Sequence, residues 1–331
     1  TAATSPASTA AQGPLSGLRV MDVSIMAAGP WTAALLGMLG AEVIKVEPPA
    51  GDGTRWVAPT QRGMGTNFMS MNVNKKDIVL DFKKPEDRAT AIELAASCDI
   101  FVQNFRVGVI ERLGLDYESL RKVNPNLIYC AISGFGQTGP SSHEAGYDGK
   151  IQAMSGIMSI TGHPEMGPTR AGFAVCDVLS GMTAAFAVSS ALFQRTHTGR
   201  GQFIDVSMLE ASLAFLSTQV ADFTVAGHHQ EQFGNQAISR KVTANLFRAK
   251  DSWLLLAVND EKQYRNLMTA LGRTEVFDDP RFPDWFARKD NEAALRAIIE
   301  EAAGVLKFRK RKEKAERRLE ATDGDLTRVQ D

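Results

Sequence analysis

The sequence predicts an α/β protein with a Rossmann-like large domain, built on a parallel sheet, and a smaller α+β domain after it. From residue 15 onward, short apolar runs with a period of two alternate with amphipathic stretches of period 3.6. Such alternation is typical of βα units, whose strands form a parallel sheet covered by helices. The length of 331 residues also exceeds that of one average domain, which is about 150 residues.

The large domain, expected over 15–226, supplies these elements in order. Its expected strands are LRVMDV (18–23), EVIKVE (42–47), DIVLDF (77–82), DIFVQNF (99–105), LIYCAISGFG (127–136) and FIDVSM (203–208). Its expected helices occupy 31–39, the stretch after Pro85, 109–113, 117–123, 152–159 and 178–194. The glycines of TGRGQ (198–202) end the last helix.

The remaining segments differ from the large domain in composition and periodicity. Residues 227–298 mix short strands such as WLLLAV (253–258) with helical stretches, which predicts the smaller α+β domain. Residues 1–14 are mostly Thr, Ala, Ser and Pro without periodicity, so a disordered tail is expected. Residues 299–331 crowd charges around an apolar heptad stripe, which predicts a charged, coiled-coil-like helix or a solvated terminal helix.

Composition argues against several classes of protein. The 37 Lys and Arg residues balance 38 Asp and Glu residues, so no global field favours nucleic acid or a membrane surface. No apolar run of about 18 residues and no signal-peptide pattern appear, so a cytoplasmic protein without a membrane partner is expected. Cys98, Cys130 and Cys176 are an odd number without CxxC spacing, and each is expected to be a buried thiol.

Motifs for common cofactors are also missing. The sequence has no HExxH, GxSxG or Walker motif, so neither a metal site nor a serine hydrolase is expected. Glu47 ends a strand as the ribose-binding acid of dinucleotide folds does, but the preceding turn at 27–30 reads AAGP instead of GxGxxG. A nicotinamide cofactor is therefore not expected.

Two carboxylates stand where a loop meets a helix: Asp148 in AGYDG and Asp177 in AGFAVCDVLSG. Asp177 begins an apolar helix, where a carboxylate can cap backbone N–H groups. Between Val175 and Val178 it could instead be a covalent nucleophile, reactive because it is stripped of water. The residues alone leave both interpretations open.

Five long motifs closely resemble class III CoA-transferases, the family of formyl-CoA transferase and carnitine CoA-transferase. They are LSGLRVMDVSIMAAGPWTAALLGMLGAEVIKVEPPAGD (15–52), NVNKKDIVLDFKKPE (72–86), VQNFRVGVIERLGLDYESLRKVNPNLIYCAISGFGQTGP (102–140), AGYDGKIQAMSGIMSITG (145–162) and HTGRGQFIDVSM (197–208). Together they extend in order across about residues 15–295.

The resemblance implies an enzyme that moves CoA from an acyl-CoA thioester to a small carboxylic acid, without a permanently bound cofactor. Its nucleophile falls on Asp177, which would form an acyl anhydride and then an aspartyl-CoA thioester, with N–H groups near the helix start as oxyanion donors. The implied CoA-binding residues are Ala27, Ala28, Leu80, Lys83, Asn104, Phe105, Arg112 and Tyr147. The resemblance also implies an interlocked homodimer.

Several of these assignments have alternatives. Lys83 and Arg112 would bind CoA phosphates or be solvated surface charges, and Phe105 would contact adenine or belong to the core. The related α-methylacyl-CoA racemases have a histidine where Tyr147 stands, and tyrosine, with an ordinary pKa of about 10, is a weak base at pH 7.

The end of the chain departs from the family. Residues 299–331 resemble the segment of bacterial structural-maintenance-of-chromosomes proteins in which the head runs into its coiled coil. On this interpretation the C-terminus is foreign, the small domain is incomplete, and the chain could be a non-enzymatic chimera.

Overall fold

The computed structural model describes residues 13–304, which form two compact units. Within that range the first unit contains 13–159 and 169–230, and the second contains 160–168 and 231–304. The expected boundary between the two domains lay after residue 226, and residues 160–168 were expected to belong to the large domain. The expected disordered tail, apart from its last two residues, and the coiled-coil-like stretch from 305 onward lie outside the described residues.

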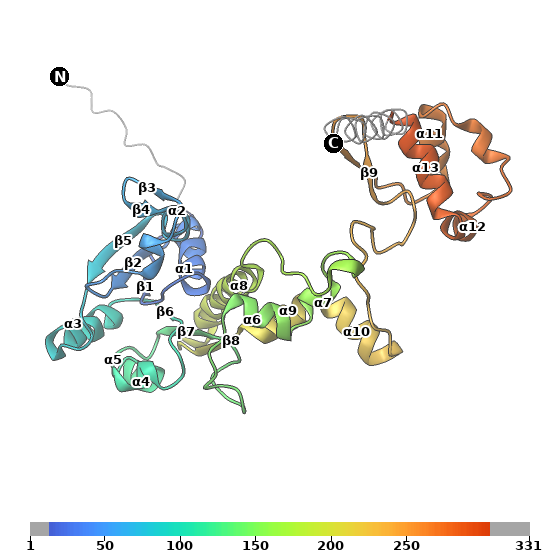
Figure 1. Cartoon of the computed structure of the whole chain (residues 1–331). Coiled ribbons are helices and arrows are strands. Elements are labelled where there is room, and N and C mark those ends of the chain that lie inside the picture. Colours follow the sequence, from blue (N-terminus) through green and yellow to red (C-terminus); the bar gives the residue numbers. More distant parts are fainter. Residues whose placement is uncertain (1–12, 305–331) are drawn as a thin grey trace, which may run out of the picture. The chain divides into compact units, whose positions relative to one another are not determined.

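A six-stranded parallel sheet forms the centre of the first unit (Figure 1). Its order is β5-β2-β1-β6-β7-β8. The strands are β1 (Arg19–Asp22), β2 (Glu42–Glu47), β5 (Lys75–Val79), β6 (Ile100–Gln103), β7 (Ile128–Ser133) and β8 (Phe203–Ser207). Chain order reverses between β1 and β6, the kind of switch point where ligands bind α/β sheets. The predicted α/β fold with a parallel sheet is confirmed.

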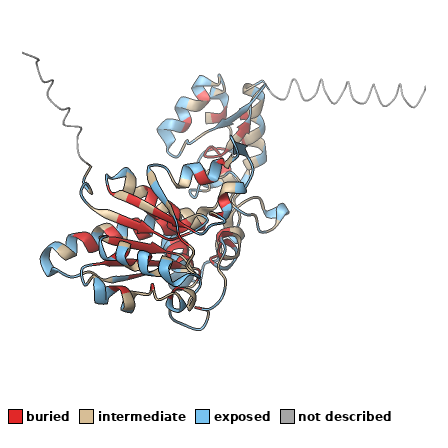
Figure 2. Ribbon diagram, turned by 90° about the vertical axis from the view of Figure 1, so that its left-hand side faces the viewer, coloured by how far each residue is buried: buried red, intermediate tan, exposed pale blue. Residues whose placement is uncertain are grey.

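One face of the sheet carries a large apolar cluster. Met21, Phe101 and Tyr129 point to this face, and Leu120 packs there with them. The rings of Phe101 and Tyr129 stack with centroids 4.9 Å apart. The helices of this layer are α3 (Pro85–Ala96), α4 (Val109–Arg112) and α5 (Tyr117–Val123). Buried residues concentrate on the strands in Figure 2.

Two long helices, α1 (Ala28–Met38) and α8 (Val175–Thr198), pack against each other and the sheet. Gly181 allows them to approach closely, since a Cβ there would lie 2.9 Å from the carbonyl oxygen of Ala28. By length and composition, α8 is the one helix in the described range that could cross a membrane. Of its apolar window, 44% is buried within the protein.

Shorter elements complete the first unit. They are η1 (Gly53–Trp56), β3 (Thr60–Gln61), β4 (Met64–Gly65), α2 (Thr66–Met71), α6 (Asp148–Met154), α7 (Ile157–Ile160), α9 (Met208–Phe215) and α10 (Ser217–Ala226). The single helix expected over 152–159 is instead the pair α6 and α7. Gly156, with φ +90°, separates them because a left-handed residue cannot continue a helix.

The second unit has its own core. Its elements are η2 (Pro164–Met166), β9 (Leu246–Arg248), β10 (Trp253–Leu255), α11 (Glu261–Ala270), η3 (Thr274–Phe277), α12 (Trp285–Asp290) and α13 (Glu292–Ala302). Phe247, Tyr264 and Leu295 are fully buried there. The expected strand at 253–258 is shorter, with only its first three residues in β10. Cys98, Cys130 and Cys176, all in the first unit, are free and buried, as expected.

Candidate functional site

Most of the implied CoA-binding residues lie where strands of the parallel sheet end. Ala27 and Ala28 follow β1, Leu80 and Lys83 follow β5, Asn104 and Phe105 follow β6, and Tyr147 precedes α6 after the long loop from β7. Arg112, in contrast, is the last residue of α4. Since the carboxyl ends of parallel strands share one edge, the fold brings the first seven to the edge that contains the switch point.

The loop between β1 and α1 is held by the side chain of Asn104. Its Oδ1 accepts a hydrogen bond from the Ile25 N–H at 2.9 Å, and its Nδ2 donates to the Ile25 carbonyl at 2.7 Å. Gly29 keeps this loop close to α1, because a Cβ there would lie 2.3 Å from the Cβ of Ser24. The glycine of the AAGP turn therefore serves close packing, and the Asn104 amide acts on the protein backbone in this structure.

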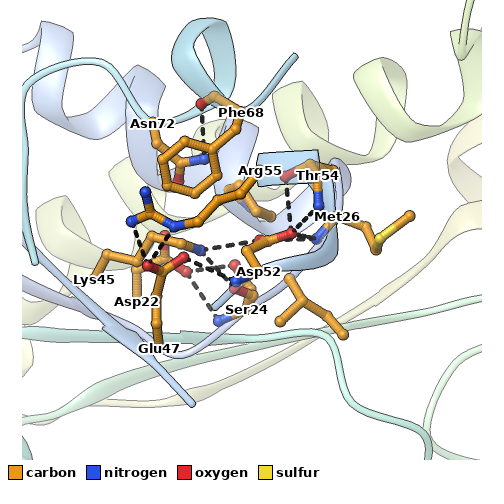
Figure 3. A network of polar contacts seen from close by, with 12 residues as sticks. Asp22, Ser24, Met26, Lys45, Glu47, Asp52, Thr54, Arg55, Phe68 and Asn72 are labelled. Atoms are coloured by element: carbon orange, nitrogen blue, oxygen red, sulfur yellow. Dashed lines mark hydrogen bonds and ion pairs between the residues drawn. The ribbon is translucent and has the colours of Figure 1, made fainter. Parts of the chain in front are cut away.

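A buried polar network fixes the same loop from its other side (Figure 3). Lys45 Nζ donates to the Ser24 carbonyl at 2.9 Å and lies 3.3 Å from Asp52 Oδ2. The Asp52 carboxylate in turn accepts from the N–H groups of Met26, at 3.2 Å, and of Thr54, at 2.9 Å. Met26 has a left-handed φ of +69°, which these contacts hold in place.

A second buried pair lies in this network. Lys75 Nζ contacts Asp22 Oδ2, the Pro30 carbonyl and Asn72 Oδ1, each at 2.8 Å. Burial alone would raise the pKa of Asp22, but the charges of Lys75 and Lys45 hold it below its ordinary value. Burial lowers the pKa of Lys75, and Asp22 opposes that shift. The network is therefore built from paired charges that are closed to water.

Arg55 closes the network towards the surface. Its guanidinium pairs with the buried carboxylate of Glu47 and stacks 3.9 Å from the centroid of the Phe68 ring. None of the pairings in this cluster, including that of Glu47, was predicted from the sequence. One signal was present: interior strands of a parallel sheet are usually apolar, so Asp22 and Lys45 on neighbouring strands mark a paired charge.

The other expected ligand residues differ in accessibility. Leu80 lies in the hydrophobic core, and half-buried Phe105 packs against that core. Tyr147 is 64% exposed, and its hydroxyl accepts a hydrogen bond from Arg106 Nη2 at 3.3 Å. Lys83 and Arg112 are exposed and form no ion pair with any residue in 13–304, so phosphate binding and solvated charge both remain compatible with their positions.

Asp177 lies in the first turn of α8 and is half-buried. Its carboxylate makes no hydrogen bond to any residue of the described range. Burial raises the pKa of Asp177 to about 6, and the nearby charge of Asp148 adds to the shift. Gly181, four residues later on the same helix face, contacts the start of α1, so Asp177 is one turn from that contact.

The capping role considered for Asp177 belongs to Asp148. Asp148 Oδ1 accepts from the N–H groups of Cys176, at 2.8 Å, and of Asp177, at 3.4 Å, while Ala174 at the N-cap provides no side-chain bond. The Val175 and Val178 N–H groups bond to the carbonyls of Phe173 and Ala174. The first-turn N–H groups expected as oxyanion donors are therefore already bonded in this structure.

The arrangement supports carboxylate chemistry. Asp177 offers a partly desolvated carboxylate without a hydrogen-bond partner in the described range, one turn before the contact of Gly181 with the start of α1. Within 13–304, no group of three or more His, Cys, Asp or Glu side chains is arranged to hold a metal ion.

A model of CoA-transferase family III matches residues 15–331. The match includes 299–331, so the predicted relation of that segment to a chromosome-maintenance protein finds no support. A mouse succinyl-CoA:glutarate CoA-transferase is 40% identical over 86% of this chain and 66% of its own length. A succinate–glutarate CoA-transferase of Agrobacterium fabrum is 40% identical over 90% of this chain and 76% of its own.

A solved structure gives the same relation. A CAIB/BAIF family protein from Brucella suis matches with a TM-score of 0.83 and 38% identity, covering 88% of this chain and 78% of that one. The chain thus spans about two thirds to three quarters of the length of these relatives.

Proposed function

Because the chain belongs to CoA-transferase family III, we propose that it transfers CoA from an acyl-CoA thioester to a carboxylic acid, with Asp177 as the covalent nucleophile. The observation that carries this proposal is the half-buried carboxylate of Asp177, which has no hydrogen bond and whose pKa burial raises to about 6. At pH 7 the group is mostly ionised, and the loss of water makes it a better nucleophile.

The reaction proceeds in two matching halves. An Asp177 oxygen attacks the thioester carbonyl, the C–S bond breaks, and an aspartyl-acyl anhydride and CoA thiolate form. The thiolate attacks the aspartyl carbonyl, which releases the donor acid as a carboxylate and leaves an aspartyl-CoA thioester. The acceptor carboxylate repeats these steps in reverse order and regenerates Asp177. Protons balance without a separate acid or base, because each nucleophile and each leaving group is an anion.

The carboxyl edge of the sheet is the proposed CoA site. The backbone of 24–26 is fixed by Asn104, Lys45 and Asp52, so it is ready to meet a ligand without reorganisation. Lys83 and Arg112 are exposed cations suited to the phosphates. The names of the mouse and Agrobacterium fabrum relatives include succinyl-CoA, succinate and glutarate, which supports a dicarboxylic acid as donor or acceptor.

The test is exchange of CoA between succinyl-CoA and a panel of mono- and dicarboxylates. Asp177→Asn is nearly isosteric but cannot form the anhydride, so we expect a loss of at least about 10³-fold in rate with CoA binding retained. Hydroxylamine added during turnover should inactivate the wild type by trapping the aspartyl thioester. Glu118→Gln, an exposed carboxylate on α5, is the matched control and should keep full activity. More than about a tenth of the wild-type rate in Asp177→Asn would exclude the nucleophile assignment.

The racemase alternative predicts a different product. A chiral 2-methylacyl-CoA incubated in D₂O should gain deuterium at its α-carbon if Asp177 and a partner exchange that proton. We expect no incorporation, since Tyr147 is exposed and tyrosine is a weak base. Incorporation that depends on Asp177 would favour a racemase.

The active form is proposed to be a homodimer. Helix α8 exposes Met182, Phe186 one turn later and Phe193 about two turns after that, and the last two are at least 70% exposed. An exposed apolar stripe on a helix is typical of an interface.

A further inference from the structure

We propose that Asp148 is the positioning residue of this site: it caps α8 from another helix and thereby leaves the carboxylate of Asp177 free to react. That Asp177 reacts rests on the proposed function, whereas the contacts of Asp148 with the start of α8 are independent of it. Asp148 contacts the backbone that carries Asp177, and it acts through that backbone.

The cap comes from outside the helix. A capping side chain usually belongs to the N-cap residue and accepts from the second or third helical N–H group. Here the N-cap is Ala174, which has no side-chain acceptor, and Asp148 Oδ1 accepts from the N–H groups of Cys176 and Asp177, the second and third residues of α8. The side chain that would otherwise cap from within, Asp177, is spared that bond.

The second oxygen of Asp148 is held as firmly. Asp148 Oδ2 accepts from Gln152 Nε2 at 2.6 Å and lies 3.6 Å from Arg170 Nη2. The same Gln152 amide accepts from the Ala171 N–H at 2.9 Å and donates to the Phe173 carbonyl at 3.3 Å. Asp148 and Gln152 on α6 therefore fix both the first turn of α8 and the loop that leads into it.

The two carboxylates have contrasting environments. Asp148 is 9% exposed and lies at the N-termini of both α6 and α8, where negative charge is favoured. Asp177, the third residue of α8, accepts no hydrogen bond from any residue in 13–304, and burial raises its pKa. Asp148 is therefore the carboxylate that holds the backbone, and Asp177 is the one that is left without a hydrogen bond.

The charged and titratable groups at this junction are few. They are Asp148 on α6, Arg170 in the loop before α8, and Cys176 and Asp177 on α8. Among the described residues, the other elements packed against α8, namely α1, α9, β7 and β8, place no charge that shifts the titration of Asp177. Removing the charge of Asp148 should therefore change the pKa of Asp177 directly.

The experiment uses the full chain and measures the titration of Asp177 itself. Carboxyl resonances of ¹³C-aspartate-labelled protein are followed against pH, and Asp177 is assigned by its absence in Asp177→Asn. Asp148→Asn keeps a capping oxygen and loses the charge, so we expect the pKa of Asp177 to fall by about one unit, the scale on which a neighbouring charge acts. The acid limb of the pH–rate profile should move by the same amount in the same direction.

Loss of the cap itself is tested separately. Asp148→Ala should lower turnover by about 10²-fold, since small displacements of a reacting group have effects of this size, and leave the CoA dissociation constant within about twofold. Glu144→Gln is the matched control, because Glu144 is an exposed carboxylate four residues earlier that pairs with Lys150. It should change neither the titration nor the rate.

Two results would overturn the positioning role of Asp148. An unchanged Asp177 titration in a folded Asp148→Asn protein would overturn the positioning role, as would an equal shift in Glu144→Gln. If Asp148→Asn does not fold, Asp148→Ser, a smaller neutral acceptor, takes the same test. The expected shift in a wild-type chain that transfers no CoA would support the positioning role and overturn the proposed function, so the two are distinguished.

Discussion

A half-buried carboxylate without a hydrogen bond destabilises the folded chain whenever it is charged. The pKa of Asp177, raised mainly by burial to about 6, lies above the ordinary value of 3.8. Between these two values the folded state binds more protons than the unfolded state, so the contribution of Asp177 to stability falls as the pH rises through this window. Reactive groups often carry such a cost.

Asp177→Asn should therefore be more stable than the wild type at pH 7.5, by a few degrees in melting temperature. The difference should shrink as the pH falls from about 6 towards 4, because the wild-type carboxyl becomes neutral and resembles the amide. Calorimetry of both proteins across this pH series checks the prediction. Glu118→Gln, which changes an exposed carboxylate, should show no such trend. Equal stability of Asp177→Asn and wild type at pH 7.5 would contradict it.

The sequence offered Asp177 as a candidate nucleophile but gave no sign of the capping role of Asp148. Its position at the start of an apolar helix was visible in the local pattern, which is why capping and nucleophilic attack were both open. The choice depends on Asp148, which is 28 residues before Cys176 and reaches it only through the fold. No local sequence pattern contains such a contact. The sequence could therefore offer capping and nucleophilic attack as roles for Asp177 but could not choose between them.

At the scale of elements, strands and helices could be predicted because their apolar residues follow simple patterns: β6 and β7 are short runs buried on both faces, and the helices bury one side. The strand β2 lies over the predicted range, 42–47. Its charges were harder to interpret: Lys45 and Glu47 are buried because Asp52 and Arg55, in the segment after β2, return to pair with them. The ion pairs of side chains on a strand are hard to predict from the strand sequence when their partners lie outside the sheet.

The buried pair of Lys75 and Asp22 should carry a large share of the stability of this network. Lys75→Met leaves Asp22 charged and fully buried without its ion-pair partner, so we expect a loss of about 3–5 kcal/mol in the free energy of unfolding. Chemical denaturation measures it. In the double variant with Asp22→Asn, much of the loss should be recovered, since the unpaired charge is gone.

The next residue provides the control. Lys76 is 73% exposed and pairs with Glu42 at the surface, so Lys76→Met should change stability by no more than about 0.5 kcal/mol. Equal effects of the two substitutions on the free energy of unfolding would show that the stabilisation does not depend on burial of the Lys75–Asp22 pair.

At the scale of the whole molecule, composition and hydropathy predicted a protein with ordinary surfaces, yet α8 combines a buried face with an exposed apolar one. Gly181 and Ala184 lie on the buried face, while Phe186 and Phe193 lie outside. The periodicity of α8 predicted a helix, but two apolar faces look alike in sequence. Only the fold distinguishes the face that packs against α1 from the face that stays exposed in the single chain.

If that outer face is the dimer interface, a charge placed on it should separate the subunits. Phe186→Glu places a carboxylate where the proposed contact excludes water, and burying an unpaired charge is costly, so we expect the variant to be monomeric. Light scattering after size exclusion should give twice the chain mass of 35.9 kDa for the wild type and 35.9 kDa for the variant. The melting temperature of the first unit should change little, because Phe186 is 75% exposed in the single chain. Phe286→Glu, at an 84% exposed phenylalanine on α12, is the matched control and should remain dimeric. A dimeric Phe186→Glu, or a wild type that is monomeric at micromolar concentration, would show that this face has another role.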